Sequence, residues 1–181
     1  DFSAEAIANG KIDAMGVARQ FLADPEWITK LMENRENDIR PCICCHNGCF
    51  NMAHYNGVPN DQALSDSMGM CHCAVNPPSM NSKKYHITKT NNPKKIAIVG
   101  GGIGGMETAR VAALRGHKPV IYEKRNELGG IFIEAASFDF KEKDKQLIEW
   151  YRKQMKDLGI EIHLNTEIKD LSEIDADKFV V

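Results

Sequence analysis

The strongest constraint on the fold is a glycine-rich turn, in which Gly100, Gly102 and Gly105 fit the pattern G-x-G-x-x-G. The apolar residues 96–99 before it predict a buried strand, and residues 104–115 after it predict a helix. In such a strand–turn–helix unit, the first glycine makes the tight turn, the second lets a ligand approach the backbone, and the third lets helix and strand pack closely. The free N–H groups at the start of the helix can then bind phosphate groups.

An acidic residue and a second glycine pair extend this unit. Glu123 ends the next predicted strand, about 20 residues after the turn, where a carboxylate can bind the ribose hydroxyls of a dinucleotide. Gly129 and Gly130 follow, and they would let a second loop approach the same ligand. A predicted helix over 143–158 and a strand over 160–166 continue the β-α-β alternation. The sequence therefore predicts a parallel, doubly wound α/β domain that binds a dinucleotide.

Composition and charge exclude several classes of protein. A net charge of -2 gives no reason to expect nucleic acid or an anionic membrane as a partner. The N-terminus has no signal-peptide pattern, and every apolar run is far shorter than the ~20 residues of a membrane-spanning helix. We therefore expect a cytoplasmic protein. Since the chain starts without methionine and ends on an apolar run, we also expect it to be part of a longer protein.

The six cysteines are clustered. Cys42, Cys45 and Cys49 give the spacing C-x2-C-x3-C, and Cys71 and Cys73 follow as C-x-C. In the cytoplasm thiols are kept reduced, so clustered cysteines are more often ligands or catalytic groups than disulfides. The spacing favours an iron–sulfur cluster with four thiolate ligands. A structural zinc site, whose ligands more often come as C-x2-C pairs, and unliganded or redox-active thiols remain open.

The chain divides into three parts. Residues 1–40 predict a helix, a buried strand over 12–18, and a second helix with Asp24 as its N-cap. Residues 41–92 are rich in Asn, Ser, Met, Pro and Cys and show no period, so something other than a hydrophobic core must hold them, and a metal or cluster would do so. Residues 93–181 form the α/β domain described above.

Two stretches resemble a known family. "RPCICCHNGC", followed by "CAVNP" and then "KKIAIVGGGIGGMETARVAALRGH", resembles the NADH:flavin oxidoreductases related to 2,4-dienoyl-CoA reductase, enoate reductase and trimethylamine dehydrogenase. "GGGIGGMETA" with "YEKRNELGGIF" resembles the FAD-binding half of the two-dinucleotide-domain flavin reductases. The resemblance implies an α/β chain with the end of an FMN-binding (β/α)8 barrel in 1–40. A [4Fe-4S]-binding segment and linker would follow in 41–92, and a partial Rossmann-like FAD-binding domain in 93–181.

The resemblance also assigns the cysteines. The four cluster ligands that it implies are Cys42, Cys45, Cys49 and Cys73. Cys44 stands at a position that is usually small in the family, and Cys71 has no counterpart. The interval between the third and fourth ligands is longer than usual, so residues 56–70 look like an insertion. His46 and His72 are expected to be loop residues near the cluster rather than ligands.

A third stretch, "KIDAMGVARQFLADPEW", resembles the last strand of the FMN barrel and the turn that follows it. Gly16, Ala18 and Arg19 match the family's phosphate-binding G-x-G-R, with alanine in place of the second glycine. A backbone N–H contact to phosphate survives this change, although a left-handed conformation at Ala18 would be strained. Arg19 would add a charge-assisted hydrogen bond to the phosphate.

The implied function is that of an oxidoreductase. Electrons would pass from NAD(P)H through FAD and the [4Fe-4S] cluster to FMN, which would reduce an activated C=C bond of an enoate or enoyl thioester. We expect a small-molecule substrate, catalytic residues that lie outside this chain, and no turnover by this stretch alone; assembly into a homo-oligomer is compatible with the sequence. Two alternatives are a reductase like the small subunit of glutamate synthase, against which residues 12–25 argue, and a non-enzymatic, zinc-stabilised binding module.

Overall fold

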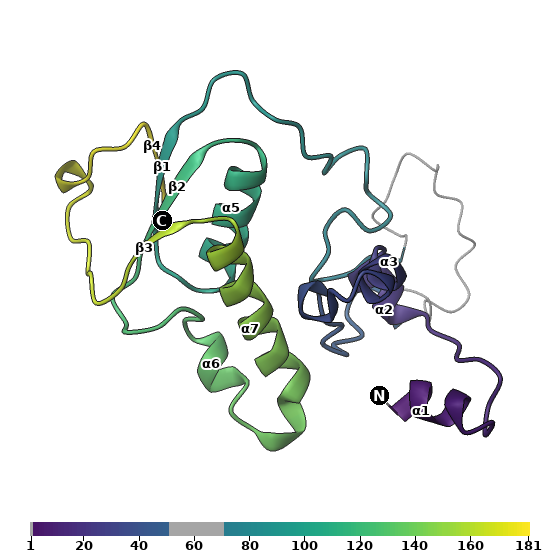
Figure 1. Cartoon of the computed structure of the whole chain (residues 1–181). Helices are drawn as coiled ribbons and strands as arrows, with labels where there is room; N and C mark the ends of the chain where they lie inside the picture. The colour runs from purple at the N-terminus through teal and green to yellow at the C-terminus, as the bar shows by residue number, and fades with distance from the viewer. Residues whose placement is uncertain (1, 51–70) are drawn as a thin grey trace, which may run out of the picture.

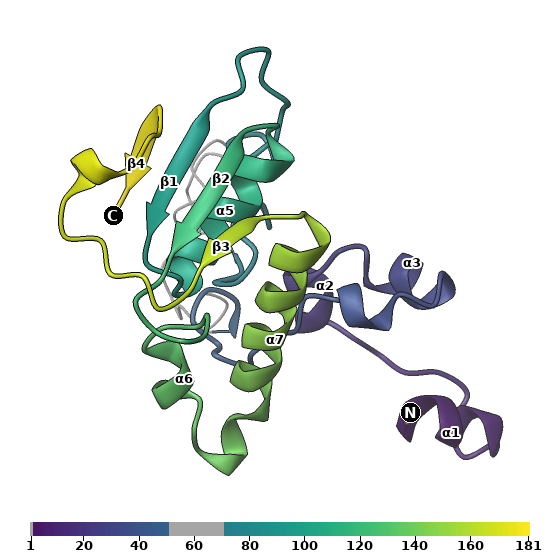
Figure 2. The same ribbon diagram turned by 60° about the vertical axis from the view of Figure 1, so that its left-hand side comes forward.

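The computed structural model describes residues 2–50 and 71–181 and contains a parallel sheet of four strands. The strands are β1 (Lys95–Val99), β2 (Lys118–Tyr122), β3 (Glu161–His163) and β4 (Lys178–Val180), and their order across the sheet is β3-β2-β1-β4 (Figure 2). The chain adds strands on one side of β1 and then crosses to the other side. This reversal makes the carboxyl end of β1 the switch point where doubly wound folds bind their ligands.

Two long helices pack on one side of the sheet. They are α5 (Ile103–Leu114) and α7 (Glu142–Asp157), and Figure 1 shows them between the sheet and the N-terminal helices α2 and α3. Between the strands and these helices lie the largest of the fully buried side chains, which are Ile98, Met106, Ile121 and Met155. None of the helices formed by the described residues is both long and apolar enough to cross a membrane.

The remaining elements are short. The α-helices are α1 (Phe2–Ala8), α2 (Arg19–Ala23), α3 (Trp27–Met32) and α6 (Phe132–Ala135). The 3-10 turns are η1 (Glu36–Asp38), η3 (Asp139–Lys141) and η4 (Leu171–Glu173). The predicted insertion at 56–70 lies outside the described residues.

The α/β prediction for the C-terminal part is confirmed. The strand, turn, helix and second strand lie within one residue of their predicted bounds, and so does α7, which was predicted over 143–158. The predicted strand over 160–166 is shorter, because Asn165 adopts a left-handed φ of 53° and the Thr166 N–H donates to the carbonyl of Glu123 at 2.8 Å. The chain therefore leaves the sheet after His163.

The prediction of a buried strand over 12–18 is wrong for this structure. These residues form no helix or strand, and all of them are exposed except Val17, which is half-buried. The physical reason is that no other strand among residues 2–50 and 71–181 lies beside them to pair with their backbone groups. The helix expected after Asp24 begins at Trp27, two residues later than Pro25, while the Asp24 carboxylate accepts a hydrogen bond from the Glu26 N–H at 3.1 Å.

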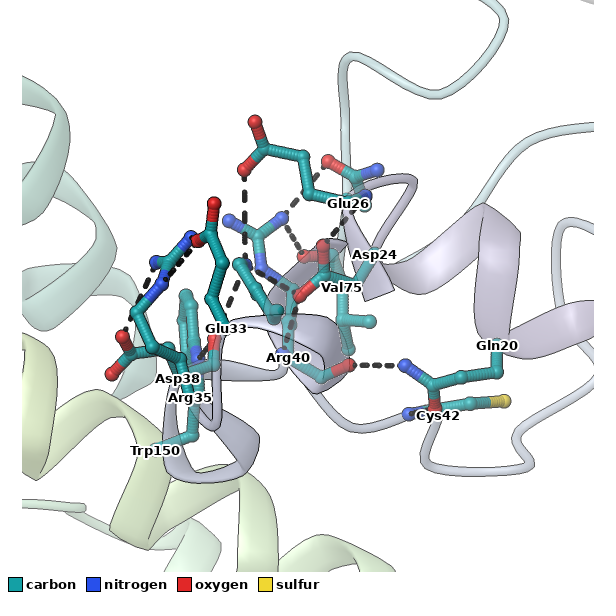
Figure 3. A network of polar contacts seen from close by, with 12 residues as sticks. Gln20, Asp24, Glu26, Glu33, Arg35, Asp38, Arg40, Cys42, Val75 and Trp150 are labelled. Carbon is teal, nitrogen blue, oxygen red and sulfur yellow. Dashed lines mark hydrogen bonds and ion pairs between the residues drawn. The ribbon is translucent and has the colours of Figure 1, made fainter. Parts of the chain in front are cut away.

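A buried carboxylate holds the N-terminal part together (Figure 3). Asp24, which is 4% exposed, accepts hydrogen bonds from Lys30 Nζ at 2.7 Å and from the Arg40 N–H at 2.8 Å, in addition to that of Glu26. A buried carboxylate is stable only when its oxygens are satisfied in this way. Asp24 thus fixes the point where the chain turns toward the cysteines.

The side chain of Arg40 connects this part to the rest of the chain. Arg40 Nη1 donates to the carbonyl of Val75 at 2.8 Å and to Asn76 Oδ1 at 2.9 Å, and its guanidinium lies 4.6 Å from the ring centre of Trp150 on α7. Trp150 Nε1 in turn donates to the carbonyl of Asp38 at 2.9 Å. One buried cation therefore contacts the loop after the last cysteine and the helix of the α/β domain.

Replacing Gly105 by alanine should destabilise the α/β domain, because the added Cβ would lie 2.0 Å from the carbonyl oxygen of Gly100. We expect G105A to lower the free energy of unfolding by on the order of 1–3 kcal/mol, the usual cost of overpacking. Urea unfolding followed by circular dichroism measures the change. G104A is the matched control, since a Cβ there meets nothing within 4 Å; equal losses in both variants would contradict the packing argument.

Removing the Asp24 carboxylate should have a large effect on stability. D24A leaves the N–H of Arg40 and the ammonium of Lys30 without their buried partner, so we expect a loss of about 3 kcal/mol in the free energy of unfolding. E26A is the control, because its carboxylate is 3.9 Å from the same ammonium but 73% exposed. A D24A protein as stable as E26A would show that the buried network does not stabilise this segment.

Candidate functional site

A cavity of about 440 Å³ opens at the carboxyl ends of β1 and β2. Four residues predicted to bind the dinucleotide line it, namely Gly100, Gly102, Glu123 and Gly130. The other side of the cavity is formed by the stretch 166–168 that follows β3. The cavity therefore lies at the switch point of the sheet, where a doubly wound fold binds its ligand.

Two glycine loops lie against each other at this cavity. The Gly129 N–H donates to the carbonyl of Gly101 at 2.8 Å, and a Cβ on Gly130 would lie 3.0 Å from the Cα of Gly102. Gly100 and Gly130 have φ values of 107° and 57°, in the left-handed region that favours glycine. The predicted approach of the second glycine loop to the first turn is thus present in the structure. Gly101, an unspecified position of the G-x-G-x-x-G pattern, takes part in this loop–loop contact through its carbonyl.

The carboxylate of Glu123 holds the glycine turn in place. Glu123 is 5% exposed, and its oxygens accept hydrogen bonds from the Gly101 N–H at 2.6 Å and from the Arg125 N–H at 2.8 Å. Each carboxylate oxygen has two lone pairs, so the group retains the capacity to accept from the hydroxyls of a ribose. The residues at this end of the sheet thus fit the adenosine and pyrophosphate part of FAD.

A second cavity lies between the two cysteine loops. Among the residues that line it are all four predicted cluster ligands, Cys42, Cys45, Cys49 and Cys73. Leu22, Ile43 and Val75 contribute apolar walls, whereas Cys44 and Cys71 are not part of the lining. The donor set and the apolar surroundings fit a cluster held by four thiolates. Within residues 2–50 and 71–181, however, no three His, Cys, Asp or Glu side chains are arranged so that they could already share a metal ion.

Close backbone packing brings the two cysteine loops together. The His72 N–H donates to the carbonyl of Gly48 at 2.8 Å, and a Cβ on Gly48 would lie 2.4 Å from the His72 ring and 2.8 Å from its carbonyl oxygen. Only a glycine fits at position 48 without displacement. Sequence reasoning missed Gly48, although its place directly before Cys49 in "CHNGC" was a signal that the backbone needs room there.

Gln20 positions the backbone in front of the first cysteine. Its side-chain amide donates to the carbonyl of Arg40 at 2.8 Å and accepts from the Cys42 N–H at 3.0 Å, as Figure 3 shows. The Gln20 side chain thus forms hydrogen bonds with the carbonyl of Arg40 and the N–H of Cys42, the two kinds of backbone group that a neighbouring strand would otherwise pair. Sequence reasoning missed Gln20, Arg40 and Asn76, because no local motif relates residues that are 20 or more positions apart.

The thiol of Cys73 belongs to a half-buried residue. Burial raises its pKa, and the nearby Cys45 and Cys49 thiols raise it further, whereas hydrogen bonds from the backbone N–H groups of Val75 and Asn76 lower it. Burial also raises the pKa of the Cys42 thiol. Thiols in such surroundings stay protonated near neutral pH unless a metal compensates the thiolate charge.

The other two cysteines differ from each other. Cys44 is exposed, adopts a left-handed φ of 54°, and places its Sγ 3.9 Å from the carbonyl of Cys42. Burial raises the pKa of Cys71 and the charge of Cys49 raises it further, so Cys71 lies near the third predicted ligand. Neither Cys44 nor Cys71 lines the cavity, and of the two only Cys44 is exposed.

Of the predicted phosphate-binding residues, only Arg19 reaches the cysteine cavity. Its guanidinium contacts the ring of His46, which packs on Phe50 with ring centres 5.3 Å apart. Gly16 and Ala18 are exposed, and Ala18 has a φ of -119°, so alanine is not strained there. Arg19 and His46 therefore join the first residue of α2 to the first cysteine loop.

Comparisons with known proteins agree with these features. The chain is 39% identical to a cinnamate reductase of Clostridium sporogenes, over all of this chain and 26% of that protein. It is 34% identical to an NADH oxidase of Thermoanaerobacter brockii, over 90% of this chain and 23% of the relative. A solved structure of 2-naphthoyl-CoA reductase with 2-naphthoyl-CoA superposes with a TM-score of 0.77 at 33% identity, over 91% of this chain and 23% of that one.

The chain thus spans about a quarter of the length of these relatives. They are oxidoreductases of the iron–sulfur flavoenzyme type that the motifs indicated, a group that uses FAD, FMN, a [4Fe-4S] cluster and NADH. The predicted recognition and cofactor set are therefore confirmed at the level of the group. Residues 78–180, which include the glycine turn, β1 to β3 and the helices between them, match the pyridine nucleotide-disulphide oxidoreductase family, and the chain belongs to this family.

Proposed function

We propose that this chain is the part of an iron–sulfur flavoenzyme that carries electrons from a bound FAD toward an FMN. The observation that carries the proposal is the common cavity of Cys42, Cys45, Cys49 and Cys73, on a chain whose α/β domain has a dinucleotide cavity of its own. Two redox sites on one chain fit electron transfer better than they fit a binding module stabilised by zinc.

In this proposal each site has its own residues. Gly100, Gly102 and Gly130 let FAD approach the backbone, Gly105 and Gly129 allow the close packing that shapes the two loops around it, and Glu123 binds its ribose. The four cysteines hold the cluster, while Gly16, Ala18 and Arg19 belong to the phosphate site of FMN. When bound there, FAD would accept hydride from NAD(P)H, the cluster would transfer single electrons, and FMN would deliver hydride to an activated C=C bond.

The relatives support a substrate class. Cinnamate is an enoate, and 2-naphthoyl-CoA is a thioester conjugated to an aromatic ring, so both carry the electron-poor carbon framework that accepts hydride. We propose an enoate or an enoyl thioester as the substrate of the full-length protein. The test is NADH-dependent reduction of cinnamate and of an enoyl thioester by full-length protein purified without oxygen, with iron, sulfide, FAD and FMN measured on the same sample. Zinc in place of iron and sulfide would contradict the proposal.

The ligand assignment predicts different outcomes for two neighbouring cysteines. C49S should lose the cluster, because it removes one of four thiolates, whereas C44S should keep it, because Cys44 is exposed and outside the cavity lining. Iron and sulfide per protein and the visible absorbance of the cluster measure the result in the full-length protein. Equal loss of iron in both variants would show that the assignment is wrong.

The proposed role of Glu123 predicts a specific loss of FAD. In E123Q an amide N–H2 faces one of the backbone N–H groups of Gly101 and Arg125, and the ribose loses a charged acceptor, so we expect FAD to bind at least about tenfold more weakly. The FAD content of purified protein and its fluorescence on titration give the measurement. E134Q is the control, since the exposed Glu134 of α6 contacts the Arg125 side chain at 2.6 Å. Loss of FAD in the control alone would refute the role of Glu123.

A further inference from the structure

The second glycine loop of the dinucleotide site needs groups outside itself to hold its conformation. Gly129 and Gly130 have φ values of 132° and 57°, both in the left-handed region. Glycine loses more conformational freedom on folding than any other residue, so two consecutive glycines are costly to order. Gly130 lines the cavity, and the shape of the cavity therefore depends on the groups that hold this loop.

Arg152 of α7 holds the peptide group that joins Leu128 to Gly129. Its Nε and Nη2 both donate to the carbonyl of Leu128, at 3.0 and 2.5 Å. The N–H of the same peptide, on Gly129, donates to the carbonyl of Gly101 in the glycine turn at 2.8 Å. A donor on the carbonyl of a peptide polarises the peptide and strengthens the bond that its N–H donates. Arg152, one peptide group and the glycine turn thus form a continuous chain of hydrogen bonds.

Two further contacts hold the loop beside this peptide. The side chain of Leu128 is 7% exposed, and a Cβ on Gly101 would lie 2.4 Å from its Cδ2. On the other side of Gly129, the carbonyl of Gly130 accepts a hydrogen bond from Arg125 Nη1 at 3.3 Å. The Arg125 contact is the longer one, and Arg152 donates with two nitrogens. Arg152 is therefore the stronger of the two side-chain anchors.

The ion pairs of Arg152 are less important than its contact with the loop. Its guanidinium lies 2.6 Å from the carboxylate of Glu127 and 2.8 Å from that of Glu149, and these side chains are 49% and 68% exposed. Exposed ion pairs contribute little to stability. The two charge-assisted hydrogen bonds to the Leu128 carbonyl instead fix a main-chain group directly before the glycines.

We propose that Arg152 is a positioning residue for FAD, which keeps the second glycine loop against the glycine turn and so preserves the shape of the cavity. The inference rests on the proposed function, in that FAD must bind between the two loops. Arg152 is not among the residues that line the cavity, so it acts through the Leu128–Gly129 peptide and not by touching the ligand. The helix α7 thereby contributes to cofactor binding from outside the site.

The test is the FAD content of the purified full-length protein and its rate of FAD release, with FAD separated from FMN by chromatography. R152M removes both donors to the Leu128 carbonyl, and we expect FAD to dissociate about tenfold faster. R152K keeps a cation that can donate to the carbonyl but loses the planar fork, so the rate should rise by a smaller factor. This partial rescue, together with a changed visible circular dichroism of FAD-saturated R152M, distinguishes positioning from a loss of stability alone.

Two variants are matched controls. E149Q removes an exposed carboxylate that pairs with the same guanidinium, but it leaves the contact with the loop. R115M removes an exposed arginine of the same domain, at the C-terminal end of α5, away from the loop. We expect both variants to release FAD at the wild-type rate.

The results distinguish failure of this inference from failure of the proposed function. A wild-type protein without FAD would contradict the proposed function, whereas a wild type with FAD and an R152M release rate equal to that of R115M would overturn only the role of Arg152. If R152M does not fold, as judged by far-ultraviolet circular dichroism, R152K decides, and release at the wild-type rate in R152K overturns the proposal. Failure of both variants to fold would also overturn it, because Arg152 would then be needed for the fold rather than for FAD.

Discussion

The structure depends on the buried side chain of Arg40, because this one group contacts all three parts of the chain. Its backbone is held by Asp24 and Gln20, its guanidinium bonds to the loop after Cys73, and its flat face lies on Trp150 of α7. Ala23, Val75 and Trp150 belong to the same apolar core, so the hydrogen bonds lie beside an apolar region. In such surroundings each polar contact is stronger and its loss is more costly.

At the dinucleotide site, too, one side chain has both a structural role and a ligand-binding role. Glu123 satisfies the backbone of the glycine turn and of the segment after β2, and the same carboxylate is placed to meet a ribose. The turn itself depends on contacts that admit no side chain, since Gly105 packs on the carbonyl of Gly100 and Gly130 packs on Gly102. The groups that shape the cavity are therefore the groups that would bind the ligand.

Whether a sequence prediction was correct depended on how far apart along the chain the interacting residues lie. The strand, turn and helix around Gly102, and the helix α7, depend on local patterns and were predicted correctly. The strand over 12–18 was wrong, because an apolar run becomes a strand only beside another strand, and the pattern contains no information about that neighbour. Gly48 and Gln20 were missed for a similar reason. Gly48 packs against His72, and Gln20 bonds to the backbone beside Cys42, far along the sequence in both cases.

The sequence by itself determined the type of chemistry: a glycine turn with an acidic residue after the second strand, and cysteines spaced for a cluster. These are local facts, since spacing along the chain limits which donors can converge. Only the tertiary structure decided which groups converge. It brings Cys73 to the loop of Cys42, Cys45 and Cys49, excludes Cys44 from the cavity lining, and directs the side chain of Arg40 to the carbonyl of Val75. The physical reason is that burial and hydrogen bonding select among donors by their positions in space, which the order of residues does not specify.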